Sequence, residues 1–250
     1  MNGLVDRTVA WLTFRQLFVR RRLIAAVVFS LVPTLIAVVF LATWAKGDAH
    51  TAEFLTGLYR EIVVGTLLPL AAVVLGTVAF GGEIDDGTIV YLLVKPIPRW
   101  RVVLSKYVVA VAATAAVMAP AILLPWLVIG VGVVAAGVPL AFAAGVAVGT
   151  VLYSALFLLF GLSSRRGLVL GLLYIVVLEF VMSRNVAGVR SLSIREFALT
   201  IVGKLASGKP GIAAGTVSME TVWTMSAVIF AGSLALAIHR LRTYEMAERL

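Results

Sequence analysis

The chain has 250 residues, of which 62% are hydrophobic and 13% are charged, and its mean hydropathy is +1.08. Soluble domains are about 45–50% apolar and about 25% charged, so this chain has more apolar surface than a water-soluble fold of its size can bury, and the excess must face lipid. The absence of cysteine excludes a disulfide scaffold and thiolate metal sites, and the net charge of +9 is interpreted first as a membrane-topology signal rather than a nucleic-acid site.

Residues 4–22 predict an interfacial helix that leads into the first membrane span. Val5, Val9, Leu12 and Val19 fall near one helical face, and Arg20–Arg22 would lie at the level of the lipid headgroups. The arginines could equally form a simple positive anchor, and the two interpretations do not exclude each other. The first apolar run starts too late and is too long for a cleaved signal peptide.

Six apolar segments predict membrane-spanning helices, since about 20 apolar residues cross about 30 Å of hydrocarbon. Unsatisfied backbone groups are too costly in lipid for irregular structure, so we expect an all-α polytopic fold. A glycine-rich break at 130–139 divides the long charge-free stretch into a third and a fourth span, and no linker or repeat divides residues 1–250, which predict one domain. The predicted spans are residues 23–44, 62–80, 107–129, 140–162, 167–183 and 221–239.

The distribution of Lys and Arg predicts the orientation of these spans. Fourteen of the 21 basic residues fall in the two termini and the loops on their side, and seven fall in the alternate loops, five of them in one long loop. Long loops cross the membrane largely regardless of charge, so the bias in the short loops is stronger still. We therefore expect a multi-pass protein of the plasma (inner) membrane with both termini in the cytoplasm.

The segment between the second and third predicted spans, residues 81–106, carries most of the functional information. Gly81 and Gly82 are expected to end the second helix, and three acids follow on a side where the other short loops are basic. Thr88 can cap a short helix that Pro96 and then Pro98 would stop. The three acids, and the glycines and prolines at the two ends of the segment, favour a docking element for a cytoplasmic protein over a helix that lies on anionic lipid headgroups.

This segment resembles the first cytoplasmic loop of permease subunits of type 2 ATP-binding-cassette exporters. The matching pattern is Glu83-x-x-x-Gly87-Thr88, then Leu92-Leu93, Lys95-Pro96 and Arg99, with Lys106 opening a span. The resemblance implies a coupling helix at about residues 84–95, seated in a groove of a separate ATPase subunit. The residues that it assigns to ATPase coupling are Glu83, Asp85, Asp86, Gly87, Thr88, Leu92, Leu93, Pro96 and Arg99.

The resemblance also implies the partners and the pathway. Two copies, or this chain and a related permease, would pair with two ATPases, and ATP and magnesium would bind the ATPases, with no cofactor in this chain. The substrate would pass between the permeases along the second and fifth helices. Short extracytoplasmic helices are implied between spans five and six, in agreement with the spacing of Leu192, Phe197, Ile201 and Leu205.

Glu179 is the one acid well inside a predicted span, and a membrane carboxylate is a functional candidate by default. Two interpretations stay open: a pathway or gating role, or a structural role in which Glu179 pairs with Arg184 or caps an extracytoplasmic helix. The segment Gly203–Pro210 matches the glycine and lysine spacing of a phosphate-binding loop. Pro210, however, lacks the hydroxyl and the N–H that such a loop needs at this position. No catalytic or metal-binding residues are predicted.

The function that these observations favour is a permease that works only with a cytoplasmic ATPase, and the chain itself is not expected to be an enzyme. Mostly aliphatic spans favour a lipophilic or amphiphilic substrate, and the expected contacts are ATPase subunits, a second permease and membrane lipids, with no nucleic acid. The alternatives are a stand-alone channel, a lipid-modifying membrane enzyme, or an ATPase-coupled mechanotransmission complex that moves no small molecule.

Overall fold

A computed structural model describes residues 6–17, 20–43, 47–85, 87, 97–164, 166–182, 187–209, 212 and 215–247. Helices account for 89% of these residues, and no strand occurs among them, which confirms the all-α prediction. The longer helices are α2 (Arg20–Thr43), α4 (Leu68–Asp85), α6 (Arg99–Pro125), α7 (Gly137–Ser163) and α11 (Met219–Ala247). The shorter α-helices are α1 (Arg7–Leu17), α3 (Asp48–Gly57), α8 (Gly167–Tyr174) and α10 (Ile194–Leu205). Three π-helical segments, η1 (Leu58–Leu67), η2 (Trp126–Gly130) and η3 (Ile175–Met182), and a 3₁₀ helix, η4 (Ala187–Leu192), complete the described elements.

Five continuous helical stretches in the described part of the chain are long and apolar enough to span a membrane. The predicted span 62–80 lies within a longer helical stretch that runs through α3, η1 and α4. This stretch extends beyond the charge-free residues 62–80 at both ends. The predicted span 167–183 corresponds to α8 and η3, a shorter apolar helix over Gly167–Met182 that reaches only about 24 Å. The five candidate spans are Ala26–Thr43, His50–Ile84, Arg99–Gly130, Gly137–Ser163 and Met219–Thr243.

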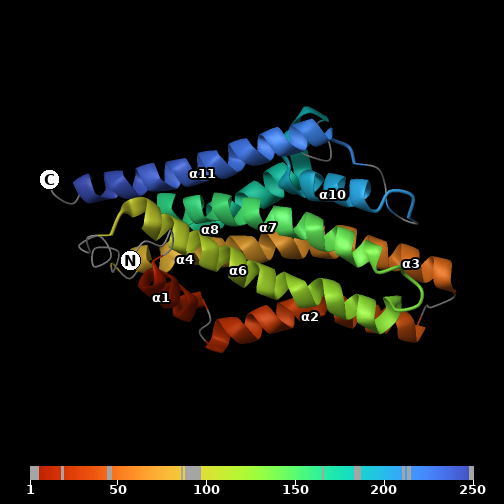
Figure 1. Ribbon diagram of the computed structural model, residues 1–250. Coiled ribbons are helices and arrows are strands. Elements are labelled where there is room, and N and C mark those ends of the chain that lie inside the picture. Colours follow the sequence, from red (N-terminus) through yellow and green to blue (C-terminus); the bar gives the residue numbers. More distant parts are fainter. Residues whose placement is uncertain are drawn as a thin grey trace.

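The helices form one elongated bundle around α7, which packs against α4, α6, α8, α10 and α11 (Figure 1). The helix α1 and the last turns of α11 lie at one end of the bundle, named here the α1 end. The helix α3, the turn at residues 131–136 and α10 lie towards the opposite end, named the α3 end. The predicted break at 130–139 is present, because the helices end at Gly130 and start again at Gly137.

The spans meet closely where glycine removes a side chain from the interface. A Cβ atom at Gly161 of α7 would lie 2.4 Å from the carbonyl oxygen of Thr77 in α4. Nearby, Phe80 and Leu158 are fully buried in a core cluster at the α1 end. The backbones of α4 and α7 can therefore pack at a distance that a larger residue would prevent.

The second helix ends later than the sequence predicted. Instead of ending at Gly81 and Gly82, α4 continues to Asp85, because Glu83 and Ile84 are buried against neighbouring helices. Tertiary contacts thus outweigh the low helix propensity of two glycines. Residues 84 and 85 belong to α4, and the rest of the coupling helix predicted at about residues 84–95 lies outside the described residues apart from Gly87.

The N-terminal helix α1 covers Arg7–Leu17, and the structure describes only part of its predicted apolar face. Val9, Thr13 and Leu17, which recur at four-residue intervals, are at most 3% exposed, whereas Leu12 is 45% exposed. Of the residues predicted for that face, Val9 is therefore buried and Leu12 lies at the edge of the buried stripe, while Val5 and Val19 lie outside the described residues. Arg20–Arg22 belong to the first turn of α2.

Candidate functional site

A buried ion pair joins α4 to α6 at the base of the segment that the sequence predicted to couple to an ATPase. Lys106 is 0% exposed, and its Nζ atom lies 2.8 Å from Glu83 Oε1. The same ammonium donates a hydrogen bond to the carbonyl of Ala79 and lies 4.6 Å from the centre of the Phe80 ring. A carboxylate, a carbonyl and an aromatic face thus replace the water that a buried ammonium loses.

The helix α1 is tied to the same place. The backbone N–H of Asp6 donates to Ser105 Oγ at 2.8 Å, and Ser105 directly precedes Lys106. The Asp6 carboxylate in turn caps α1 by accepting from the N–H groups of Thr8 and Val9. The elements α1, α4 and α6 are therefore joined through two neighbouring residues of α6, Ser105 and Lys106.

The glycine that terminates α4 is Gly87. Its φ of +67° is in the left-handed region, and its N–H donates to the carbonyl of Ile84 at 3.3 Å. This geometry is typical of a glycine at the C-terminal end of a helix. Gly87 is exposed, and a Cβ atom there would meet nothing within 4 Å, so backbone conformation alone requires glycine at this position.

The structure describes four of the nine predicted coupling residues, and these four lie at the end of α4 or at the start of α6. Glu83 is 8% exposed and faces α6, Asp85 is the last residue of α4, and Arg99 is the first residue of α6, directly after Pro98. The structure thus brings Glu83 to Lys106, which the sequence interpretation treated only as the start of a span. The remaining predicted coupling residues, Asp86, Thr88, Leu92, Leu93 and Pro96, lie outside the described residues.

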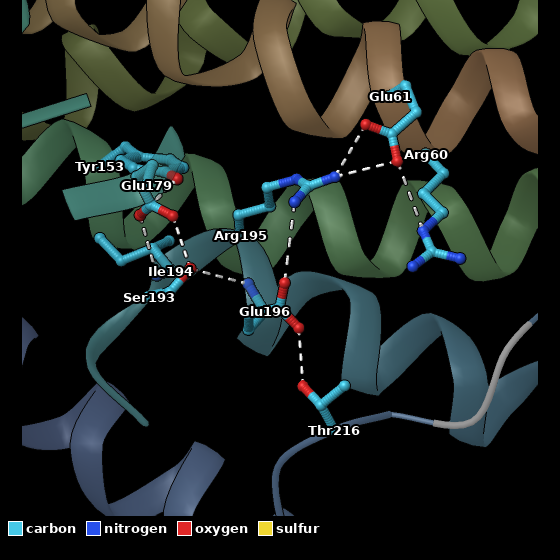
Figure 2. A network of polar contacts seen from close by, with 9 residues as sticks. All are labelled: Arg60, Glu61, Tyr153, Glu179, Ser193, Ile194, Arg195, Glu196 and Thr216. Carbon is cyan, nitrogen blue, oxygen red and sulfur yellow. Dashed lines mark hydrogen bonds and ion pairs between the residues drawn. The ribbon is translucent and has the colours of Figure 1, made fainter. Parts of the chain in front are cut away.

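A second polar site surrounds the other predicted residue, Glu179, towards the α3 end (Figure 2). Glu179 is 1% exposed, and its Oε1 atom accepts hydrogen bonds from Tyr153 Oη at 2.8 Å and from the N–H of Ile194 at 3.0 Å. Its Oε2 atom accepts from Ser193 Oγ at 2.5 Å. The carboxylate therefore lies at the N-terminus of α10, where the helix dipole favours a negative charge.

The residues at this N-terminus also cap α10 themselves. Ser193 Oγ accepts from the N–H of Glu196 at 3.2 Å, and the sequence Ser193-Ile-Arg-Glu196 has the spacing of a capping box. This local signal could have located the start of α10 from the sequence alone. Arg184, the alternative partner proposed for Glu179, lies outside the described residues.

One step along α10, Arg195 forms an ion pair with a different span. Its Nη2 atom lies 3.1 and 3.0 Å from the two carboxylate oxygens of Glu61 in η1, and Arg195 is 6% exposed (Figure 2). Arg60 also approaches Glu61, while Glu196 lies 3.7 Å from Arg195 and accepts from Thr216 Oγ1. The start of α10 is thus attached to η3 through Glu179 and to η1 through Arg195.

Both attached spans depart from regular α-helix where they carry these acids. Glu61 lies in η1 and Glu179 lies in η3, and π-helical segments are rare and frequent at functional sites. The Arg195 side chain crosses η1 beside Gly65, where a Cβ atom would lie 3.1 Å from Arg195 Nε. The π-helical turns of η1 and the lack of a side chain at Gly65 together allow the guanidinium of Arg195 to reach Glu61.

The body of α10 is buried deep beside α7. Phe197, Ala198 and Val202 are at most 2% exposed, and a Cβ atom at Gly145 would lie 2.6 Å from the carbonyl oxygen of Ala198. Gly145 is eight residues into α7, or about 12 Å from its start. The helix α10 therefore enters the bundle from the α3 end rather than lying across its surface.

The apolar spacing predicted for residues 185–220 is only partly reflected in burial. Phe197 is fully buried and Ile201 is 7% exposed, whereas Leu192 and Leu205 are 46% and 61% exposed. The sequence interpretation missed Lys106, Glu61, Arg195, Ser193 and Tyr153 as members of these two sites. Glu61 and Arg195 are 134 positions apart, so no local pattern could have paired them.

The family of the chain follows from a comparison with known proteins. No curated protein matches the sequence. A family model described as an ABC-2 family transporter protein matches residues 18–189, which include both ends of the predicted coupling segment as well as Glu61 and Glu179. This match covers more than half of the chain and confirms the resemblance seen in residues 83–106. The chain therefore belongs to the ABC-2 family of ATP-binding-cassette transporter membrane proteins.

Proposed function

We propose that the chain is the transmembrane subunit of an exporter that separate cytoplasmic ATPase subunits drive. Permeases of this family generally work with such subunits. Two copies, or this chain and a related permease, would form the pathway in the plasma (inner) membrane, and ATP and magnesium would bind the ATPases. The α1 end would face the cytoplasm and the α3 end would face outward, in agreement with the excess of Lys and Arg at the α1 end.

The Lys106–Glu83 pair is the observation that carries this proposal. The segment 86–96 leaves α4 just after Glu83 and returns at the start of α6, so a partner that moves this segment moves both helices together. A buried ion pair resists separation, because either charge alone would be left without compensation. The ATPase cycle would therefore tilt α4 and α6 as one unit and change the access of the pathway.

At the outward end, α10 would act as the closure of the pathway. It enters the bundle beside α7 and is held by Glu179 and Arg195 on two spans that move relative to each other in such a cycle. Movement of α4 would act on η1, which continues directly into α4, and so on the Arg195–Glu61 pair. In this proposal Glu179 positions the closing helix and does not contact the substrate.

The substrate would be lipophilic or amphiphilic. The α8–η3 helix presents aliphatic side chains on its outer face, including Val169, Leu173 and Val176, which are between 54% and 57% exposed. A surface of this kind suits lipid, a second permease and apolar cargo, whereas sugars or ions would require polar groups along the path. The two permeases would bring the second and fifth spans together at their interface.

The test is purification of the chain from its native membrane followed by reconstitution into vesicles. The proposal expects an ATP-binding subunit to copurify in a fixed ratio, and lipids or amphiphilic compounds to stimulate its ATP hydrolysis. Conductance or lipid modification by the purified chain without any ATPase would instead support the channel or enzyme alternative. ATP hydrolysis in a stable complex that moves none of the compounds offered would favour mechanotransmission.

A further inference from the structure

An apolar cavity lies between α1, α2, α4 and α6, and none of its lining residues belongs to either polar site. Its volume is about 310 Å³, and its nine lining side chains are all aliphatic or aromatic. They include Leu17 at the end of α1, Phe29 of α2 and five residues of α4 between Leu70 and Val78. Pockets that bind small molecules usually combine an apolar wall with a few polar groups. A cavity lined without any charged side chain fits a hydrocarbon chain better than a polar compound.

The length of the cavity is close to the hydrocarbon thickness of one leaflet of a bilayer. The cavity follows α4 from Val78 to Leu70, about 12 Å, and Val78 is about 10 Å from the end of α4 at the α1 end. One leaflet contributes about 15 Å of hydrocarbon, half of the usual core. The cavity therefore lies between about 10 and 22 Å from the end of α4 at the α1 end, and its length is comparable with that of a single acyl chain.

The helix α2 does not fill this space. Only 22% of the residues in Ala26–Thr43 are buried, compared with 67% in an 18-residue apolar window of His50–Ile84, and α2 lies on the outside of the bundle (Figure 1). Ala26 and Phe29 line the cavity, and both are only half-buried. The cavity is partly open to the outside of the bundle, so an acyl chain can enter it from the surrounding lipid. An apolar group in this space would give α2 a continuous contact with α4.

The sequence beside the cavity indicates the headgroup. Three arginines, Arg20–Arg22, form the first turn of α2, which starts three residues after the cavity-lining Leu17. Arg15 is in the last turn of α1 and is exposed. Basic residues at this level of a membrane attract anionic lipids. An acyl chain in the cavity would place its phosphate beside the α1–α2 junction, where these cations lie in the chain.

We propose that this cavity binds one acyl chain of a resident anionic phospholipid, with the headgroup at the α1–α2 junction. The lipid fills the space between α2 and α4, whereas α2 packs directly against α6, and the lipid is not the transported substrate. This binding requires neither ATP nor an ATPase, so it stands or falls separately from the proposed transport function.

The test is native mass spectrometry of the purified chain after exchange into mixed micelles that contain equal amounts of phosphatidylglycerol and phosphatidylcholine with the same acyl chains. We expect one retained lipid per chain and a preference for phosphatidylglycerol of at least about fivefold, the contribution of one arginine near a membrane surface. Replacing Arg20–Arg22 with glutamine should remove the preference but leave a lipid bound. Equal retention of the two lipids by the natural chain would overturn the anionic assignment.

The matched pair Ala71→Trp and Ala235→Trp tests the location. Ala71 lines the cavity, whereas Ala235 is exposed on α11, outside it. We expect Ala71→Trp to reduce lipid retention at least tenfold, because the indole occupies the cavity, and Ala235→Trp to retain lipid like the natural chain. Equal retention by the two variants would refute the cavity as the site.

A second measurement covers the case in which Ala71→Trp does not fold. A phosphatidylglycerol with a photoreactive diazirine in the middle of its acyl chain should label residues 70–78 of the natural chain. Labelling confined to other lipid-facing helices would also refute the proposal.

Discussion

Removing the carboxylate of Glu83 should destabilise the protein strongly, because it leaves the Lys106 ammonium buried with only a carbonyl and an aromatic ring. Removal of one partner of a buried ion pair typically costs about 3–5 kcal/mol, and Lys106 is 0% exposed and cannot reach water without moving α4 or α6. For a chain of this size each kcal/mol lowers the melting temperature by roughly 2–4 °C. The expected decrease for Glu83→Gln is therefore roughly 6–20 °C.

The assay is thermal unfolding in detergent micelles, followed by tryptophan fluorescence. The double variant Glu83→Gln/Lys106→Met should recover most of the lost stability, because a buried pair can often be replaced by groups that need no charge compensation. The difference between the double variant and the sum of the single variants measures the coupling between the two residues. A melting temperature for Glu83→Gln within about 1 °C of the natural chain would refute the account of this pair.

Four further changes test other parts of the account. Gly87→Val should reduce substrate-stimulated ATP hydrolysis in the reconstituted complex, because it strains a backbone with φ of +67°, whereas Gly87→Asn should be close to neutral; equal activities would contradict this. Arg195→Met should raise the rate of amide hydrogen exchange at the start of α10 roughly 10- to 100-fold, as expected for the loss of charged hydrogen bonds. An unchanged exchange rate would mean that the Arg195–Glu61 pair does not hold α10 in place. Glu179→Gln should lower transport, because an amide nitrogen replaces one of the two oxygens that accept hydrogen bonds at α10; normal transport would remove Glu179 from gating. Gly145→Ala should lower the melting temperature, because its Cβ atom would lie 2.6 Å from a backbone oxygen, whereas Gly232→Ala, with nothing within 4 Å, should not; similar melting temperatures would argue against the packing of α10 on α7.

Hydropathy predicted the helical character and the approximate positions of most spans, because exposure to lipid imposes an apolar composition on nearly every residue of such a helix. The stretch of 58 charge-free residues is too long for one span, so two were predicted, and the glycine-rich segment located the break between η2 and α7. Hydropathy underestimated the second span. A span that starts at residue 62 leaves Arg60 and Glu61 outside the membrane helix, but the structure pairs Glu61 with Arg195 and places Arg60 and Glu61 inside η1.

The two polar sites were harder to predict because they depend on contacts between distant parts of the chain. The sequence singles out Glu83 as an acid on a side whose other short loops are basic, and Glu179 as an acid inside an apolar span. Local spacing does not predict the partners of either residue. Lys106 is 23 positions from Glu83 and lies on another helix. The sequence therefore identified one acid of each site, Glu83 and Glu179, and only the folded chain identifies Glu61 and the groups that these acids hold in place.

The central claim is that work from an ATPase enters the membrane through residues 86–96. The chain has no cysteine, so Leu92→Cys and Val131→Cys can each carry a benzophenone crosslinker at a unique position, the first in this segment and the second in the turn at the α3 end. Irradiation of native membranes should join position 92, and not position 131, to an ATP-binding subunit, and ATP should change the yield. A complex that hydrolyses ATP but gives no crosslink at position 92, or equal crosslinking at both positions, would contradict the account.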